Sequence, residues 1–98
     1  MAKYMVLYEV DTSRTPEDAK KKKAQWLGML ESAARQLKEG VVKDWGGFAG
    51  EMSGYVIFEG SAVDLNAYTT MWVPFCRVKV REIMTVNEVI KSIKALPE

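Results

Sequence analysis

Residues 44–60 read DWGGFAGEMSGYVIFEG, a run rich in glycine that ends in an apolar segment. Its composition divides around GEMS, residues 50–53, into two strand-like arms joined by a turn. The first arm is more polar and carries Gly46 and Gly47, which favours an edge strand with a bulge or a close backbone approach. The second arm, YVIF at residues 55–58, is apolar at every position and favours a central strand. The stretch therefore predicts a β-hairpin with one edge strand and one central strand.

Two further strands are expected, one before and one after this hairpin. Residues 4–10, YMVLYEV, are apolar in both alternating sets apart from one glutamate, so this strand needs cover on both faces. Residues 76–84, CRVKVREIM, alternate between apolar and charged positions, which is typical of an edge strand with one buried face. We therefore expect residues 4–10 to form the second central strand and residues 76–84 the second edge.

Three helices are expected between and after the strands. The first runs from about Pro16 to Glu39, where Thr15 would cap its start and Gly40 would end it in a left-handed conformation. The second starts after Ser61 and the third after Thr85, each with an acidic residue three positions on, as in a capping box. Each helix carries an apolar stripe at helical spacing. The stripe residues are Trp26, Leu30, Ala33 and Leu37 in the first, Leu65, Tyr68 and Trp72 in the second, and Val86, Val89, Ile90 and Ile93 in the third.

The resulting order is β-α-β-β-α-β followed by a helix, which is the ferredoxin-like pattern of the α+β class with an antiparallel sheet. One domain is expected over residues 1–98, because this length suits one small core. The two helices between strands cover a single sheet face, so the apolar second face needs other cover. A second copy of the chain is the partner that this predicts, as a homodimer through the sheet face.

Composition argues against several classes of function. Lys and Arg number 14 and Asp and Glu 13, so the net charge of +1 lacks the bias that nucleic-acid binding usually shows. No apolar run approaches roughly 18 residues, so no membrane partner is expected. Cys76 is the one cysteine, which excludes an internal disulfide, favours a small core residue and fits a cytoplasmic location. Without histidine or a spaced ligand set, neither a metal nor a cofactor is expected.

Nearly the whole chain resembles the dimeric α/β-barrel superfamily, in which two ferredoxin-like sheets pack face to face. The resemblance rests on the opening strand KYMVLYEVD, a first helix containing WL, the hairpin at residues 44–60 and the VPF break before the last strand. A group of small uncharacterised prokaryotic proteins shares this look. Distant relatives include antibiotic-biosynthesis monooxygenases, muconolactone isomerase and haem-degrading monooxygenases, the last of which use a histidine that this chain lacks. Because these enzymes share a fold but catalyse different reactions, the fold alone does not indicate which reaction to expect.

Carboxylates at strand ends form the first candidate site. The two central strands are expected to run parallel, so that Glu9 and Glu59 lie at the same end of the sheet, where Arg77 at the start of the last strand joins them. Carboxylates beside a guanidinium and a helix terminus can acquire a pKa suited to proton transfer, which makes Glu59 and Glu9 candidate catalytic residues. The alternative is a structural ion pair with Arg77 or Arg14, or a solvated position.

Aromatic side chains form the second candidate site, a cavity between helices and sheet that would bind a flat apolar ligand. Plain core packing is the alternative, because an aromatic stripe at helical spacing is more often core. The candidate ligand-binding residues are Tyr8, Trp26, Trp45, Tyr55, Tyr68, Trp72 and Arg77, with Phe58 beside them.

Two classes of function stay open. In the first, a homodimer binds a small apolar or aromatic molecule, or a partner protein, through this cavity. In the second, it is a cofactor-independent monooxygenase or isomerase acting on an aromatic or polyketide-like molecule, with Glu9 or Glu59 as acid–base group and Tyr8 or Tyr55 orienting the ligand. Chemistry would require a polar group inside the cavity.

Overall fold

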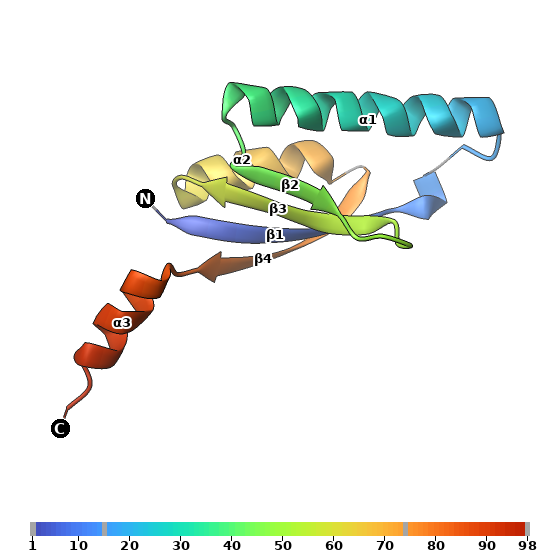
Figure 1. Ribbon diagram of the computed structural model, residues 1–98. Coiled ribbons are helices and arrows are strands. Elements are labelled where there is room, and N and C mark those ends of the chain that lie inside the picture. The colour runs from blue at the N-terminus through green and yellow to red at the C-terminus, as the bar shows by residue number, and fades with distance from the viewer. Residues whose placement is uncertain (1, 15, 74, 98) are drawn as a thin grey trace.

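The computed structural model describes residues 2–14, 16–73 and 75–97 and shows a ferredoxin-like α+β fold followed by a terminal helix (Figure 1). This confirms the predicted fold class. In chain order the elements are β1 (Lys3–Val10), the short 3₁₀ helix η1 (Thr12–Arg14), α1 (Ala19–Glu39), β2 (Asp44–Gly47), β3 (Ser53–Glu59), α2 (Ala62–Trp72), β4 (Cys76–Ile83) and α3 (Val86–Lys94).

The four strands form one sheet in the order β2-β3-β1-β4, and every neighbouring pair is antiparallel. The prediction that β1 and β3 are central and that β2 and β4 are edges is confirmed. The prediction that β1 and β3 run parallel is wrong. Each helical crossover joins two strands of the same direction but skips the strand between them, so β1 is parallel to β2 and antiparallel to its neighbour β3.

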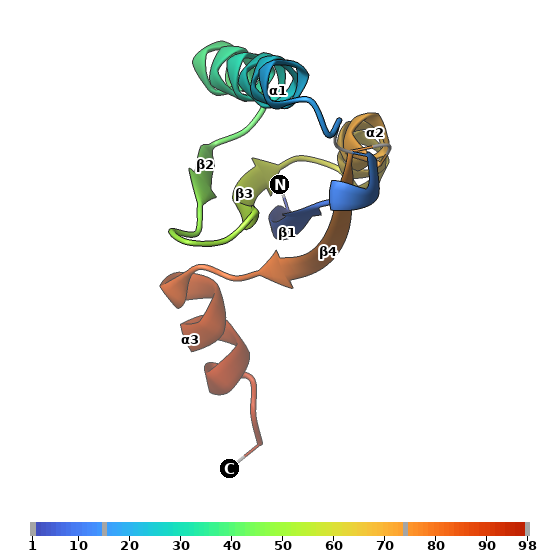
Figure 2. The ribbon, with the colours of Figure 1, turned by 90° about the vertical axis from the view of Figure 1, so that its right-hand side faces the viewer.

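The strand register assigns side chains to two faces. Val6 lies opposite Val56 on β3 and Val80 on β4, on the face that α1 and α2 cover (Figure 2). The buried cluster on this side consists of Val6, Val42, Val56, Phe58, Leu65 and Tyr68. The other face, which no helix of the described chain covers, is called the open face below. It has an apolar middle of Met5, Leu7, Tyr55 and Ile57 beside the cations Arg77, Lys79 and Arg81 of β4.

Helix α1 begins at Ala19, later than predicted, because Asp18 is its N-cap. The Asp18 side chain accepts a hydrogen bond from the Lys21 backbone N–H at 3.0 Å, and aspartate is a stronger cap than threonine. Thr15, the predicted cap, lies outside the described residues. Gly40 ends the helix with φ 79°, which confirms its predicted left-handed conformation.

The caps of the other two helices are confirmed. Ser61 accepts a hydrogen bond from the Asp64 N–H at 3.1 Å, and the full reciprocal capping box forms between Thr85 and Glu88. Helix α3 then extends away from the end of β4, on the side of the sheet opposite α1 and α2 (Figures 1 and 2). The molecule is consequently long, with extents of 62 × 26 × 21 Å.

Candidate functional site

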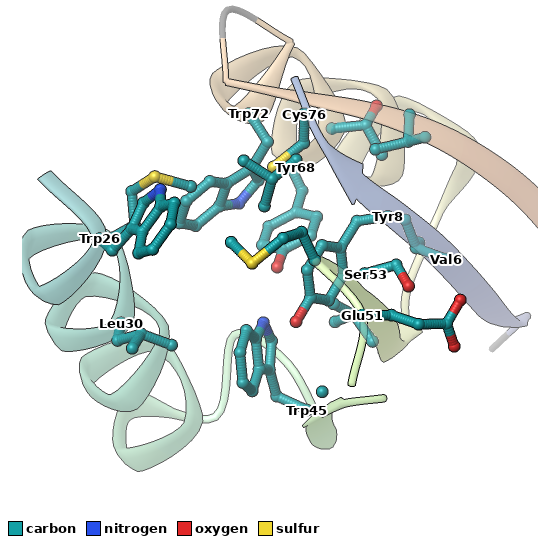
Figure 3. A pocket seen from close by; sticks show the side chains of 17 residues that line it. Val6, Tyr8, Trp26, Leu30, Trp45, Glu51, Ser53, Tyr68, Trp72 and Cys76 are labelled. Carbon is teal, nitrogen blue, oxygen red and sulfur yellow. The ribbon is translucent and has the colours of Figure 1, made fainter. Parts of the chain in front are cut away.

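A cavity of about 310 Å³ lies between the helices and the helix-covered face of the sheet (Figure 3). Its lining comes from all four strands, from α1 and α2, and from the turn between β2 and β3. Trp26 and Leu30 reach into it from α1, and Trp45 from β2 lies across from them. The cavity exists because bulky side chains, and not direct backbone contact, span the space between α1 and the sheet.

Aromatic rings make up much of the cavity wall. Tyr8 and Trp45 are stacked with ring centroids 5.4 Å apart, and Tyr68 meets Trp72 edge-on at 6.5 Å. Tyr8 can lie flat across the sheet because its partner on β3 is Gly54, which has no side chain. Its hydroxyl donates to the Gly46 carbonyl oxygen at 3.1 Å, which ties β1 to the edge strand β2. These contacts hold the rings in place without a ligand.

Three titratable side chains of the cavity wall, Tyr8, Tyr68 and Cys76, are neutral at physiological pH. Burial raises the pKa of Tyr8 to about 12 and that of Tyr68 to about 12, so both phenols keep their protons at physiological pH. Burial also raises the pKa of the Cys76 thiol, which sits in the cavity wall as the small buried residue that the sequence predicts. The cavity therefore offers phenol and thiol groups that do not act as bases.

Two indole N–H groups are left without a partner. Those of Trp26 and Trp72 are buried and make no hydrogen bond within the described part of the chain. The N–H of Trp72 lies near the Tyr68 hydroxyl and moderates the rise in its pKa, but it does not reach hydrogen-bond geometry. Since buried donors in native proteins are nearly always paired, both groups are available to an acceptor that enters the cavity.

Charge is confined to the rim of the cavity. Among the described lining residues, Glu51 alone is charged, and its carboxylate points away from the cavity (Figure 3). Within the residues that the structure describes, no three His, Cys, Asp or Glu side chains gather in a way that could hold a metal ion. The interior is thus apolar, with neutral hydrogen-bonding groups.

Five of the seven predicted ligand-binding residues line the cavity, namely Tyr8, Trp26, Trp45, Tyr68 and Trp72. Tyr55 and Arg77 do not, because strand alternation turns both to the open face. There the Tyr55 hydroxyl donates to an Asp44 carboxylate oxygen at 2.9 Å, and this hydrogen bond raises its pKa. Phe58 is buried in the core and does not line the cavity.

The predicted cluster of Glu9, Glu59 and Arg77 is wrong. Glu9 lies opposite Arg77, as expected, but Glu59 lies opposite Lys3 at the other end of the sheet. The error follows from the direction of β3, which is antiparallel to β1. Both glutamates also belong to the open face, so neither lines the cavity.

Met29, Met52 and Thr69 are among the lining residues that the sequence analysis did not name as ligand-binding. Met29 follows Trp26 by three positions, so the helical stripe could have revealed it. Met52 lies in the hairpin turn, where its carbonyl oxygen accepts a hydrogen bond from the Val10 N–H at 2.8 Å. No local pattern indicates that this turn folds against the end of β1.

The fold and the cavity together define a ferredoxin-like α+β domain with an aromatic-walled cavity between its helices and its sheet. No protein-family model matches the chain, and no curated protein matches it significantly. Within the described residues, no helix combines the length and the hydropathy needed to cross a membrane.

Proposed function

We propose that the protein binds a small apolar or aromatic molecule in the cavity between helices and sheet, and that it does so as a homodimer. The observation that carries the proposal is the cavity of about 310 Å³ among aromatic side chains. Protein cores pack at crystal-like density and hold few voids larger than a water molecule, whereas ligand pockets measure about 300–1,000 Å³. A cavity of this size favours a binding site over plain core.

The groups around the cavity favour a neutral ligand with one hydrogen-bond acceptor. The apolar walls penalise a charged ligand, because no lining cation of the described residues offsets the loss of its hydration. The unpartnered N–H groups of Trp26 and Trp72 favour an acceptor such as a carbonyl or ether oxygen. A flat aromatic ketone has this combination.

The open face supports the homodimer. Its apolar middle and the many exposed large hydrophobic residues of the chain are what an oligomer interface would bury. Two such sheets packed face to face would form a dimeric α/β barrel. Arg77, Lys79 and Arg81 lie at the β4 edge of the open face, and the carboxylates Asp44 and Glu59 lie on β2 and β3. Placing β4 over the partner's β2 brings opposite charges together, whereas β4 over β4 opposes like charges.

The alternative, a cofactor-independent monooxygenase or isomerase, has less support. Its acid–base candidates Glu9 and Glu59 lie on the other side of the sheet from the cavity. The phenol hydroxyls that line the cavity, those of Tyr8 and Tyr68, hold their protons more tightly than an ordinary tyrosine. Binding without catalysis is the function that the geometry favours.

Tryptophan fluorescence tests the proposal directly, because all three tryptophans of the chain line the cavity. We expect 2-acetylnaphthalene to quench this fluorescence saturably and to raise the melting temperature, and 2-naphthoate, of similar shape but charged, to bind at least about tenfold more weakly. Trp72→Ala should weaken binding and cost less than the roughly 3–5 kcal/mol typical of a tryptophan in a filled core.

Tyr55→Phe, on the open face, is the control and should leave binding unchanged. If a panel of neutral aromatic compounds gives no saturable change, and Trp26→Ala and Trp72→Ala each cost about 3–5 kcal/mol, the rings are plain core and the proposal fails.

A further inference from the structure

Helix α3 has an apolar stripe that its own chain leaves uncovered. Val86 is 72% exposed and Ile93 60% exposed, and Val89 and Ile90 are also exposed. No residue of α3 is buried. The opposite side carries Glu88 and Lys91, so the helix is strongly amphipathic. A short amphipathic helix gains its stability mainly by burying such a stripe.

A capping box defines the start of α3 close to the end of β4. Only Met84 and Thr85 separate it from β4. The Thr85 N–H donates to the Glu88 carboxylate at 2.9 Å, and the Glu88 N–H donates to the Thr85 hydroxyl at 3.2 Å. With this capped start, α3 projects from the sheet on the side of the open face (Figures 1 and 2).

The interface area that a stable dimer needs indicates that a second copy of the chain covers the apolar stripe of α3. Four strands of four to eight residues give a face of about 19 by 22 Å on average, or roughly 400 Å². A stable dimer of standard size buries about 800 Å² per partner, so the sheet face alone is about half of what is needed. A nine-residue helix adds a footprint of about 140 Å². In a two-fold dimer each copy both donates and receives one helix, which brings the total to roughly 700 Å².

The strand directions indicate which part of the partner α3 would contact. The end of β4, the end of β3 and the start of β2 lie at one end of the sheet, because Lys3 is opposite both Ile83 and Glu59, and Asp44 is opposite Ile57. With β4 over the partner's β2, α3 therefore emerges beside the connection between the partner's α1 and β2. Leu37 in the last turn of α1 and Val41 in that connection are exposed. They offer an apolar surface at the place where the stripe arrives.

We propose that α3 is exchanged between copies, so that its apolar stripe packs on the partner's α1–β2 connection at the partner's Leu37 and the partner's Val41. This inference rests on the proposed homodimer. In this arrangement the α3 helices of both copies add contacts to the dimer interface, one at each side of the paired sheets.

Sedimentation equilibrium of three full-length variants tests the exchange. Ile90→Asp places a charge in the stripe, Val41→Asp places one in the receiving surface, and Asn87→Asp adds the same charge outside the stripe. All three positions are exposed in the single chain, so each variant should fold. Because every contact occurs twice in the dimer, we expect the first two variants to raise the dissociation constant by about a hundredfold and the third by less than about threefold.

Amide hydrogen exchange of residues 86–94 supplies the second measurement. The exchange predicts that protection of this segment appears only at concentrations where the dimer forms. A dimer unaffected by Ile90→Asp, with residues 86–94 unprotected, overturns the exchange and leaves the homodimer standing. A dimer weakened by Ile90→Asp but not by Val41→Asp overturns the assigned receiving surface. A monomer with residues 86–94 protected at every concentration overturns both proposals, because α3 then folds onto its own sheet.

Discussion

Tyr8 and Tyr68 bring hydroxyl groups into an apolar cavity, and burial raises the pKa of each to about 12, from an ordinary value of 10.0. The folded state therefore holds these two protons more tightly than the unfolded state does. The stability that this contributes is present below pH 10 and is lost as the pH rises toward 12. We expect a spectrophotometric titration at 295 nm to show late-ionising tyrosines, with unfolding over the same range.

Tyr68→Phe should remove one late step from this titration and reduce the loss of stability between pH 10 and 12. Titration of every tyrosine near pH 10, with no change in Tyr68→Phe, would mean that the hydroxyls are open to water and that the cavity is more solvated than the structure shows.

At the scale of elements, alanine substitutions at two glycines, one in a helix and one in a strand, should change the stability in opposite directions. Gly28 lies inside α1, and an added Cβ would meet nothing within 4 Å. Gly28→Ala should therefore stabilise the protein by about 0.5–1 kcal/mol. Gly54 lies in β3, and an added Cβ would collide with the Gly46 carbonyl oxygen and the Tyr8 hydroxyl. Gly54→Ala should cost about 1–3 kcal/mol, and it should break the Tyr8 hydrogen bond that supports the cavity.

Urea denaturation of both variants measures these changes in the free energy of unfolding, with matched m-values as the sign that the transition is unaltered. If Gly54→Ala leaves the free energy of unfolding unchanged, β2 and β3 can move apart without loss of stability, contrary to their close approach in the structure.

At the scale of the whole molecule, the proposed face-to-face homodimer would bury the middle of the open face. Leu7 lies there on β1, half-buried, and Leu27 lies on α1, exposed and away from that face. We expect the protein to sediment as a dimer at micromolar concentration and Leu7→Asp to convert it to a monomer, because a charge would be buried twice in one interface. Leu27→Asp should remain dimeric. A wild-type monomer, or a Leu7→Asp dimer, would contradict assembly through this face.

Much of the architecture was predictable because it depends on local patterns. The alternation in residues 76–84, the apolar run at residues 55–58 and the caps Ser61, Thr85 and Gly40 each act within one element. Period, cap and turn chemistry are physical properties of short segments, so they identified the elements and separated central strands from edges. Five cavity residues were predictable for the same reason, because the periodic spacing of residues in a helix or a strand places their side chains on the covered face.

The sequence by itself determined the elements, their order and the apolar faces that must be covered. Only the tertiary structure decided the relative direction of β1 and β3, which separates Glu59 from Glu9 and Arg77 by the length of the sheet. It also decided that Tyr55 faces away from the cavity and that Met52 folds into it. These features depend on contacts between segments far apart in the chain, and local periodicity carries no information about the direction in which one strand meets another.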